Sequence, residues 1–171
     1  MPNNAPFTPR DLMEAVEAGD IEKTKQLLSA GVDINAEVSG GFGVMTVLIK
    51  AVMRNPDPEM ITLLINHGAD LEAKRAYGGY TPLMQAVLND RPQIVGLLLE
   101  RGAHPETQNF EGLTALDIAV ARHNDKIAHI LRTTAALAKE RATVNGIQAQ
   151  LRAAAAKKPK VRLKRGGFPS P

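Results

Sequence analysis

The string TPLMQA at residues 81–86, followed by GLLLERG at residues 96–102, decides the fold of this chain of 171 residues. The first string recurs in shortened form, as LMEA at 12–15, LIKA at 48–51 and LDIA at 116–119, with alanines 36, 35 and 33 residues apart. The second string recurs as QLLSAG at 26–31 and TLLINHG at 62–68. Two independent strings that share one period predict an internal repeat, with a short helix, a turn, a second helix and a long loop in each unit.

The pattern TPLxxA, followed by a Leu-Leu helix and a closing Gly-Ala-Asp, resembles the ankyrin repeat of about 33 residues. The resemblance covers residues 8 to about 132. It implies an all-α solenoid of helix-turn-helix units with β-hairpin-like fingers, and from the residues that follow we expect a C-terminal helix and a basic disordered tail. We expect an N-terminal arm at 1–7, an ankyrin-repeat domain at 8–138, a helical extension at 139–156 and the tail at 157–171. The four repeats are expected at about 8–37, 38–74, 75–108 and 109–138.

Polar residues mark the helix ends within each unit. Asp57 before Pro58 predicts an N-cap with proline at the first helical position, and the neighbourhood of Asp90 and Pro92 predicts another. We expect the other two second helices to be capped by Asp20 and Asp125. The turns between paired helices hold residue types that tolerate positive φ, namely Gly19, Asn55, Asp90 and His123.

The chain departs from the family pattern at one position in every repeat. The histidine that usually follows Thr-Pro-Leu is replaced by Met13, Ile49, Met84 and Asp117. In the family this histidine ties neighbouring turns together, so its loss predicts lower stiffness between repeats. The first repeat has Arg10-Asp11 in place of Thr-Pro, and a polar first helix is what an end repeat requires.

Four of the six aromatic residues fall in the predicted fingers, although most positions for apolar residues lie in helices. Large aromatic side chains bury much area with few rotatable bonds and dominate binding hot spots. We therefore predict a partner-binding surface of finger and inner-helix residues: Phe42, Met45, Met53, Arg54, Tyr77, Tyr80, Leu88, Asn89, Phe110, Leu113 and Arg122. The alternative is that the finger aromatics pack on adjacent fingers and brace the stack.

A long helix is expected after Asp125, because no helix-breaking pair occurs before Pro159. Apolar residues recur there every seven positions, at Ile130, Leu137, Val144 and Leu151. Their polar heptad partners disfavour a strong coiled coil, and we expect a monomer. Three roles are open for this helix: a cap over the last repeat, self-association, or an exposed helix for a partner.

Charge divides the chain into an acidic body and a basic end. Residues 1–138 carry 12 Lys/Arg and 17 Asp/Glu, a net charge of −5, whereas residues 139–171 carry 9 and 1, a net charge of +8. The tail concentrates its cations in one short run: Lys157, Lys158, Lys160, Arg162, Lys164 and Arg165. This run resembles a single-cluster nuclear localisation signal, and such clusters also bind nucleic acid or anionic membranes. The alternative is a solvated tail, or a tail folded back onto the acidic body.

The sequence lacks the residue patterns of enzymes. It has no cysteine, and its four histidines do not occur at a metal-binding spacing. Phosphate-loop, dinucleotide and nucleophile motifs are missing, so we expect no enzymatic activity, metal or cofactor. We expect a cytoplasmic module that binds another protein. The alternative is a nuclear or nucleic-acid-associated regulator, or a secreted effector, in which the tail targets or binds and the repeats regulate.

Overall fold

The computed structural model describes residues 7–40, 43–54 and 57–156. Contacts within the chain define two compact units, Met1–Ala135 and Ala136–Pro171. The elements along the chain are α1 (Pro9–Ala18), α2 (Ile21–Ser29), β1 (Val38–Gly40), β2 (Gly43–Met45), α3 (Val47–Arg54), α4 (Pro58–Asn66), α5 (Pro82–Leu88), α6 (Pro92–Glu100), α7 (Ala115–Ala121) and α8 (Asp125–Ala156). The predicted boundaries of the repeats, the extension and the tail stay predictions.

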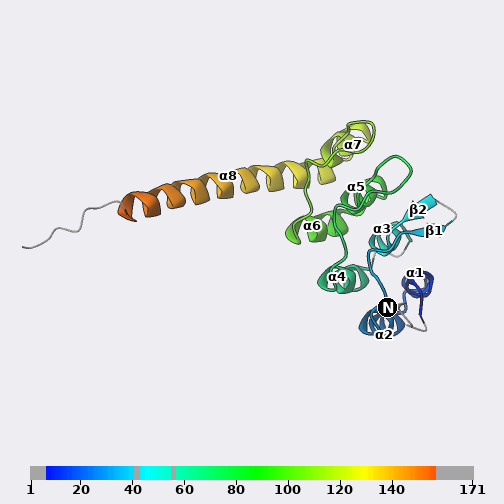
Figure 1. Cartoon of the computed structure of the whole chain (residues 1–171). Helices are drawn as coiled ribbons and strands as arrows, with labels where there is room; N and C mark the ends of the chain where they lie inside the picture. The colour runs from blue at the N-terminus through cyan, green and yellow to red at the C-terminus, as the bar shows by residue number, and fades with distance from the viewer. Residues whose placement is uncertain (1–6, 41–42, 55–56, 157–171) are drawn as a thin grey trace, which may run out of the picture. The chain divides into compact units, whose positions relative to one another are not determined.

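The helices of the first unit form a stack of pairs (Figure 1). α1 packs on α2, α3 on α4 and α5 on α6, while the inner helices α1, α3, α5 and α7 pack on one another in that order. In the loop of the first repeat, β1 and β2 form an antiparallel hairpin in which Val38 lies opposite Met45. The prediction of an ankyrin-like helical solenoid with hairpin-like fingers is confirmed.

Two of the predicted N-caps are confirmed, at Asp20 and Asp57. Their carboxylates accept backbone N–H hydrogen bonds at the starts of α2 and α4, and such a cap contributes about 1 kcal/mol. The turns between paired helices have positive φ as predicted, with 72° at Gly19, 52° at Asp90 and 55° at His123. Asn55, predicted for the same role, lies outside the described residues.

The other two predictions are right about Pro92, which is the first residue of α6, but wrong about the cap side chains. Asp90 occupies the left-handed turn, so Arg91 precedes α6 and provides no side-chain cap. Before α8 the cap is Asn124 instead of Asp125, and the Asn124 Oδ1 accepts the Ile127 N–H at 3.1 Å. In the first, third and fourth repeats the residue that precedes the second helix directly follows the residue with positive φ, so the turn decides where that helix starts.

α1 starts two residues earlier than the repeat pattern predicts. Its N-cap is Thr8 and its first residue is Pro9, so a Thr-Pro pair does begin this helix, upstream of Arg10. The Asp11 carboxylate accepts hydrogen bonds from the Thr8 N–H and the Thr8 hydroxyl, both at 2.7 Å. Together with the Asp11 N–H they complete a capping box, which fixes the first turn of the stack.

Equivalent positions of the repeats form one continuous core. The second helices bury a leucine at the same position of each repeat: Leu27, Leu64, Leu98 and Leu131. Burying such a side chain contributes about 1.5–3 kcal/mol. The inner helices bury the repeated alanines on which the family pattern rests: Ala15, Ala51, Ala86 and Ala119. Small side chains at these positions let neighbouring helices approach closely.

Hydrogen bonds between loops join neighbouring repeats that lack the family's histidine. The Asn35 amide donates to the Gly68 carbonyl at 3.0 Å. The Glu72 carboxylate accepts from the His104 N–H at 2.8 Å and from the Thr107 hydroxyl at 2.6 Å. These bonds cross from one repeat to the next and oppose the expected loss of stiffness, which stays a prediction.

α8 is much longer than the other second helices because its stop signal is missing. α2, α4 and α6 are each followed by a glycine with positive φ, 82° at Gly31, 89° at Gly68 and 97° at Gly102. The corresponding position of the last repeat holds Ala135. Alanine disfavours positive φ and favours the helix, so α8 continues through this position to Ala156.

Candidate functional site

The fingers of successive repeats are joined by backbone hydrogen bonds. The Ala76 N–H donates to the Val44 carbonyl at 3.1 Å, and the Phe110 N–H donates to the Gly78 carbonyl at 3.1 Å. Each bond links a residue of one finger to a residue of the finger before it. The fingers therefore form one connected surface instead of separate loops.

Two glycines with positive φ, Gly78 at 78° and Gly79 at 68°, lie under aromatic rings of this surface. A Cβ at Gly78 would collide with the Tyr80 ring, and a Cβ at Gly79 would collide with the Phe110 ring of the next finger. The sequence reasoning missed these glycines. The signal that could have found them is the string YGGY at 77–80, because paired glycines in a finger permit both positive φ and close approach.

The four predicted finger aromatics have different environments. Tyr77 is 77% exposed and Phe110 is 65% exposed, so a partner can reach both rings. Tyr80 is half-buried and packs against the core, which is the environment expected of a bracing residue. Phe42 lies outside the described residues.

Met45 was predicted for the binding surface, but it belongs to the core. Its side chain is only 2% exposed, and it lies at the end of β2 opposite Val38. Neighbouring residues of a strand point to opposite faces, and Met45 takes the core-facing position of this hairpin. Leu113, predicted for the same surface, is 38% exposed just before α7.

The predicted inner-helix residues lie at the ends of α3, α5 and α7. Met53 and Leu88 are half-buried against the core and present only part of their side chains. Arg54, Asn89 and Arg122 are exposed and occupy corresponding positions of three successive repeats. The Asn89 amide donates to a carbonyl in the last turn of α3 at 3.4 Å, which links this polar row to the stack.

An ion pair between a buried lysine and an exposed glutamate joins the first two repeats. The Lys50 Nζ of α3 contacts the Glu17 carboxylate of α1, and the Lys50 side chain is nearly inaccessible to solvent. A small cavity of about 20 Å³ next to Lys50, lined also by Met13 and Ser39, has room for roughly one water. Because the Lys50 ammonium group is largely shielded from solvent and pairs with the preceding repeat, we assign the pair a structural role. The sequence reasoning did not anticipate it.

The shifted pKa values have structural causes. Hydrogen bonds from the Thr8 N–H and hydroxyl lower the pKa of the Asp11 carboxyl below its ordinary value. Hydrogen bonds from the Thr114 hydroxyl and N–H do the same for the Asp117 pKa. These groups cap α1 and α7, so the shifts reflect helix capping instead of acid–base chemistry.

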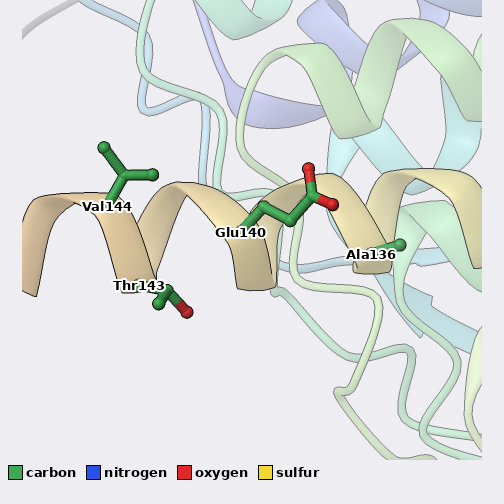
Figure 2. A pocket seen from close by; sticks show the side chains of 4 residues that line it. All are labelled: Ala136, Glu140, Thr143 and Val144. Atoms are coloured by element: carbon green, nitrogen blue, oxygen red, sulfur yellow. The ribbon is translucent and has the colours of Figure 1, made fainter.

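The residues that the structure describes provide no metal site, because no group of His, Asp and Glu side chains is placed to hold an ion. In the same residues no helix is both long and apolar enough to cross a membrane. A hollow is lined by Ala136, Glu140, Thr143 and Val144, and Figure 2 shows these four side chains along α8. All four side chains come from one helix, whereas small-molecule sites are concave, so we assign no ligand to this hollow.

The C-terminal predictions are tested only in part. Ile127 and Leu131, in the first turns of α8, are buried in the core of the first unit. In the second unit Leu137, Val144 and Ile147 are exposed. The three expected roles of this helix therefore stay open. The basic residues of the tail lie outside the described residues: Lys157, Lys158, Lys160, Arg162, Lys164 and Arg165.

Comparison with known proteins identifies relatives of the repeats. The family model described as ankyrin repeats (3 copies) matches residues 12–109. The 2-5A-dependent ribonuclease of Homo sapiens is 37% identical over 81 residues, which cover 47% of this chain and 11% of that protein. The nuclear factor NF-kappa-B p105 subunit of Mus musculus is 37% identical over 97 residues, which cover 56% of this chain and 10% of that protein. The ankyrin repeat domain-containing protein M-T5 of Myxoma virus (strain Lausanne) is 25% identical over 151 residues, which cover 67% of this chain and 31% of that protein.

The chain spans less than a third of each of these relatives, so the likeness concerns their repeat segments and not their whole activities. Ankyrin repeats are generally protein-interaction modules and are typically not enzymes, even where a relative such as the ribonuclease is named for its activity. The family match covers more than half of the chain and coincides with the stacked helix pairs. The chain belongs to the ankyrin-repeat family.

Proposed function

We propose that this chain binds a partner protein through a finger surface that consists of Tyr77, Phe110, Arg54, Asn89 and Arg122. The observation that carries the proposal is the exposure of Tyr77 and Phe110, at 77% and 65%, on fingers joined by backbone hydrogen bonds. Aromatic side chains bury much area with few rotatable bonds. Because the connected fingers are already ordered, they should lose less conformational entropy when a partner binds than flexible loops would. These are the properties of binding anchors.

The contact between Phe110 and Gly79 strengthens this argument. The Phe110 ring lies so close to the Gly79 backbone that a Cβ there would collide with it, yet most of the side chain remains exposed. The Phe110 ring thus packs against the finger backbone and remains accessible to a partner. A supported aromatic ring fits an apolar pocket of a partner, as hot-spot residues do.

The polar row at the inner-helix ends suggests the chemistry of the surrounding contacts. The Arg122 guanidinium group can donate two hydrogen bonds to a carboxylate of the partner, and the Asn89 side chain can bind a backbone amide. These exposed groups should influence specificity and association rate more than affinity, because solvent screens them. Affinity should follow the two aromatic anchors instead of the total area buried.

The proposal can be tested by capturing partners from source-cell lysate and then measuring Kd with the purified partner. We expect Tyr77→Ala and Phe110→Ala each to weaken binding by roughly tenfold or more, which corresponds to about 1.4 kcal/mol or more. Gln93→Ala, at an exposed position of α6, is the matched control and should leave Kd unchanged. Thermal unfolding must show that each variant is folded. Unchanged Kd in a folded Tyr77→Ala/Phe110→Ala double variant would refute the proposal.

Removal of residues 157–171 separates this function from one that resides in the tail. A partner that the shortened chain retains and the finger variants lose supports the finger surface. A partner lost only with the tail would favour the alternative of a nuclear or nucleic-acid-associated regulator. Binding of phosphates by the tail should also weaken steeply between about 50 and 200 mM salt, whereas finger binding should change little.

A further inference from the structure

Asn109 is a buried polar residue of the last finger, and its side chain is bonded to the backbone of its own loop. Its carbonyl oxygen Oδ1 accepts the Glu111 N–H at 3.0 Å and the Leu113 N–H at 2.9 Å. The backbone of Asn109 closes the same loop, because its N–H donates to the Leu113 carbonyl at 3.0 Å and its carbonyl accepts the Gly112 N–H at 3.1 Å. The loop of the last finger is therefore organised around one residue.

The neighbours of the Asn109 amide group determine its orientation. Its Nδ2 is buried and has no hydrogen-bond partner among the residues that the structure describes. Rotation of the amide group by half a turn would place these N–H donors against the N–H groups of Glu111 and Leu113, and two donors cannot bond to each other. The carbonyl oxygen is therefore the part of the side chain that the loop uses.

These hydrogen bonds hold the backbone next to the exposed Phe110. The bond from the Glu111 N–H to the Asn109 Oδ1 fixes the peptide group that follows Phe110. The peptide group that precedes Phe110 is also fixed, because the Phe110 N–H donates to the Gly78 carbonyl of the finger before it. Since both planar peptide groups are held, the direction of the Phe110 side chain is set, and its ring lies against the Gly79 backbone.

The two preceding fingers are ordered in other ways. Counted from the glycine that ends the second helix, Asn109 corresponds to Val38 in the first finger and to Arg75 in the finger of Tyr77. The side chain of valine has no acceptor, and that of arginine has only donors. The first finger is held by the pairing of β1 with β2, and the second contains the two glycines with positive φ. Of these three positions, only the one next to Phe110 has a side chain that can accept backbone N–H groups.

We infer that Asn109 is the positioning residue of the Phe110 anchor and thereby sets how strongly the finger surface binds its partner. The inference rests on the proposed function, in which Phe110 is one of two aromatic anchors. A loop that is ordered before binding loses less conformational entropy in the complex. The Asn109 side chain is only 5% exposed, so it orders the loop without offering a contact to the partner. Its effect on affinity should therefore pass through Phe110.

Three variants separate the loop bonds from other effects of a substitution. Asn109→Ala removes the oxygen that accepts the two N–H bonds. Asn109→Asp keeps the shape and the acceptors, removes only donors that have no described partner, and adds a charge that the two N–H groups stabilise. Gln108→Ala is the matched control, because it shortens an exposed amide side chain next to Asn109 and keeps the backbone carbonyl that accepts from the Lys74 Nζ.

NMR spectroscopy of the full chain tests the positioning without a partner. In the natural chain, the two amide protons that bond to the Asn109 Oδ1 should exchange about tenfold or more slowly than in an unstructured peptide. The Phe110 ring should shift a Gly79 Hα resonance upfield. Asn109→Ala should remove the protection and move the Gly79 resonance toward its position in Phe110→Ala, whereas the other two variants should keep both signals. Unchanged resonances of the other repeats show that a variant is folded.

A double-mutant cycle on Kd tests whether Asn109 acts through the anchor. With the purified partner used for the finger variants, Asn109→Ala should raise Kd about three- to tenfold, and Asn109→Asp should keep Kd within about twofold of the natural chain. In a Phe110→Ala background, Asn109→Ala should have almost no further effect, because the side chain that it positions is gone. A residue that only stabilises the fold would give additive effects in this cycle.

Three results would overturn the inference. The first is an Asn109→Ala variant whose amide protection and Gly79 resonance match the natural chain. The second is a folded Asn109→Asp variant that binds as weakly as Asn109→Ala. The third is an effect of Asn109→Ala on Kd that is as large without the Phe110 ring as with it. Failure of the proposed function is distinguishable, because Phe110→Ala by itself would then leave Kd unchanged, and the role of Asn109 in binding would fail with it even where the NMR results hold.

Discussion

The first and last repeats follow the same helix pattern, yet they present opposite surfaces at the two ends of the stack. α1 has Asp11 and Glu14 at the positions that face outward, whereas α7 leaves Leu116 and Val120 partly uncovered. The repeated alanines and leucines set the register in both. The comparison shows that register residues build a repeat, and that the outward residues decide whether the repeat can end a stack.

The largest difference in stability should come from a charge at the valine that follows the repeated alanine, which is Val52 in an inner repeat and Val120 in the last one. Val52→Asp buries a carboxylate in a fully enclosed site and should cost about 4 kcal/mol or more of unfolding free energy. Val120→Asp should change the stability of the monomer by roughly 0.5 kcal/mol or less, because the site is open to solvent. Urea unfolding monitored by circular dichroism measures both. Similar losses in the two variants would mean that Val120 is covered in solution.

A similar contrast in stability should appear in the fingers, at the glycines that lie two residues before Thr81 and Thr114. Gly79 and Gly112 both have positive φ, 68° and 79°, but only Gly79 has the Phe110 ring against it. Gly112→Ala should cost about 1–2 kcal/mol for the left-handed backbone alone. Gly79→Ala adds a steric collision and should cost about 2–4 kcal/mol in total. Equal costs in thermal or urea unfolding would argue against the stacking of Phe110 on Gly79.

The glycine that ends the second helix of an inner repeat should also interrupt α8 when it is placed at the corresponding position of the last repeat. Ala135→Gly introduces the glycine that ends α2, α4 and α6, so we expect α8 to fray beyond this position and far-ultraviolet circular dichroism to lose helical signal. The cost in stability should be about 1 kcal/mol at most. Ala121→Gly, a change of the same type at the end of α7, is the control for a general loss of helix propensity. An unchanged helical signal would show that α8 does not depend on the alanine.

The smallest effect should come from a feature that the two ends share, the capping box of α1 and α7. The folded-state pKa of Asp11 and of Asp117 is lowered, so each carboxylate stabilises the fold above the unfolded value of 3.8. This contribution is lost as the pH falls through the folded-state pKa. Asp11→Asn and Asp117→Asn should therefore lower stability slightly at neutral pH and flatten its decline in acid. Urea unfolding between about pH 2 and pH 6 measures the slope. A steeper acid decline in either variant would contradict the hydrogen bonds from Thr8 or Thr114.

Most of the fold could be predicted because it depends on local residues and their period. The alanine and leucine positions located every inner and second helix, and Gly19, Asp90 and His123 were expected in the left-handed turns where they are found. The predictions of Asp90 and Asp125 as N-caps were wrong, and the reason for this is also local. The turn residue takes one position, and the next residue, Arg91 or Asn124, becomes the cap.

The candidate site was less predictable, because exposure depends on residues from neighbouring repeats. Composition alone favoured Met45 and Tyr80 as much as Tyr77, since all are large apolar or aromatic residues of the finger region. Pairing in the hairpin turns Met45 into the core, and Gly78 lets the Tyr80 ring lie close to the backbone. Neither effect can be calculated from a single repeat.

The sequence by itself determined the repeat, its period, the helix pairs and the family, because these follow from spacing along the chain. Only the tertiary structure decided which of the repeated residues meet a neighbour and which meet solvent. Val52 and Val120 are the same residue in the same register, and they differ because one has a following inner helix and the other does not. Burial is a property of the assembled stack, since the hydrophobic contribution of a side chain depends on the surface that its neighbours cover.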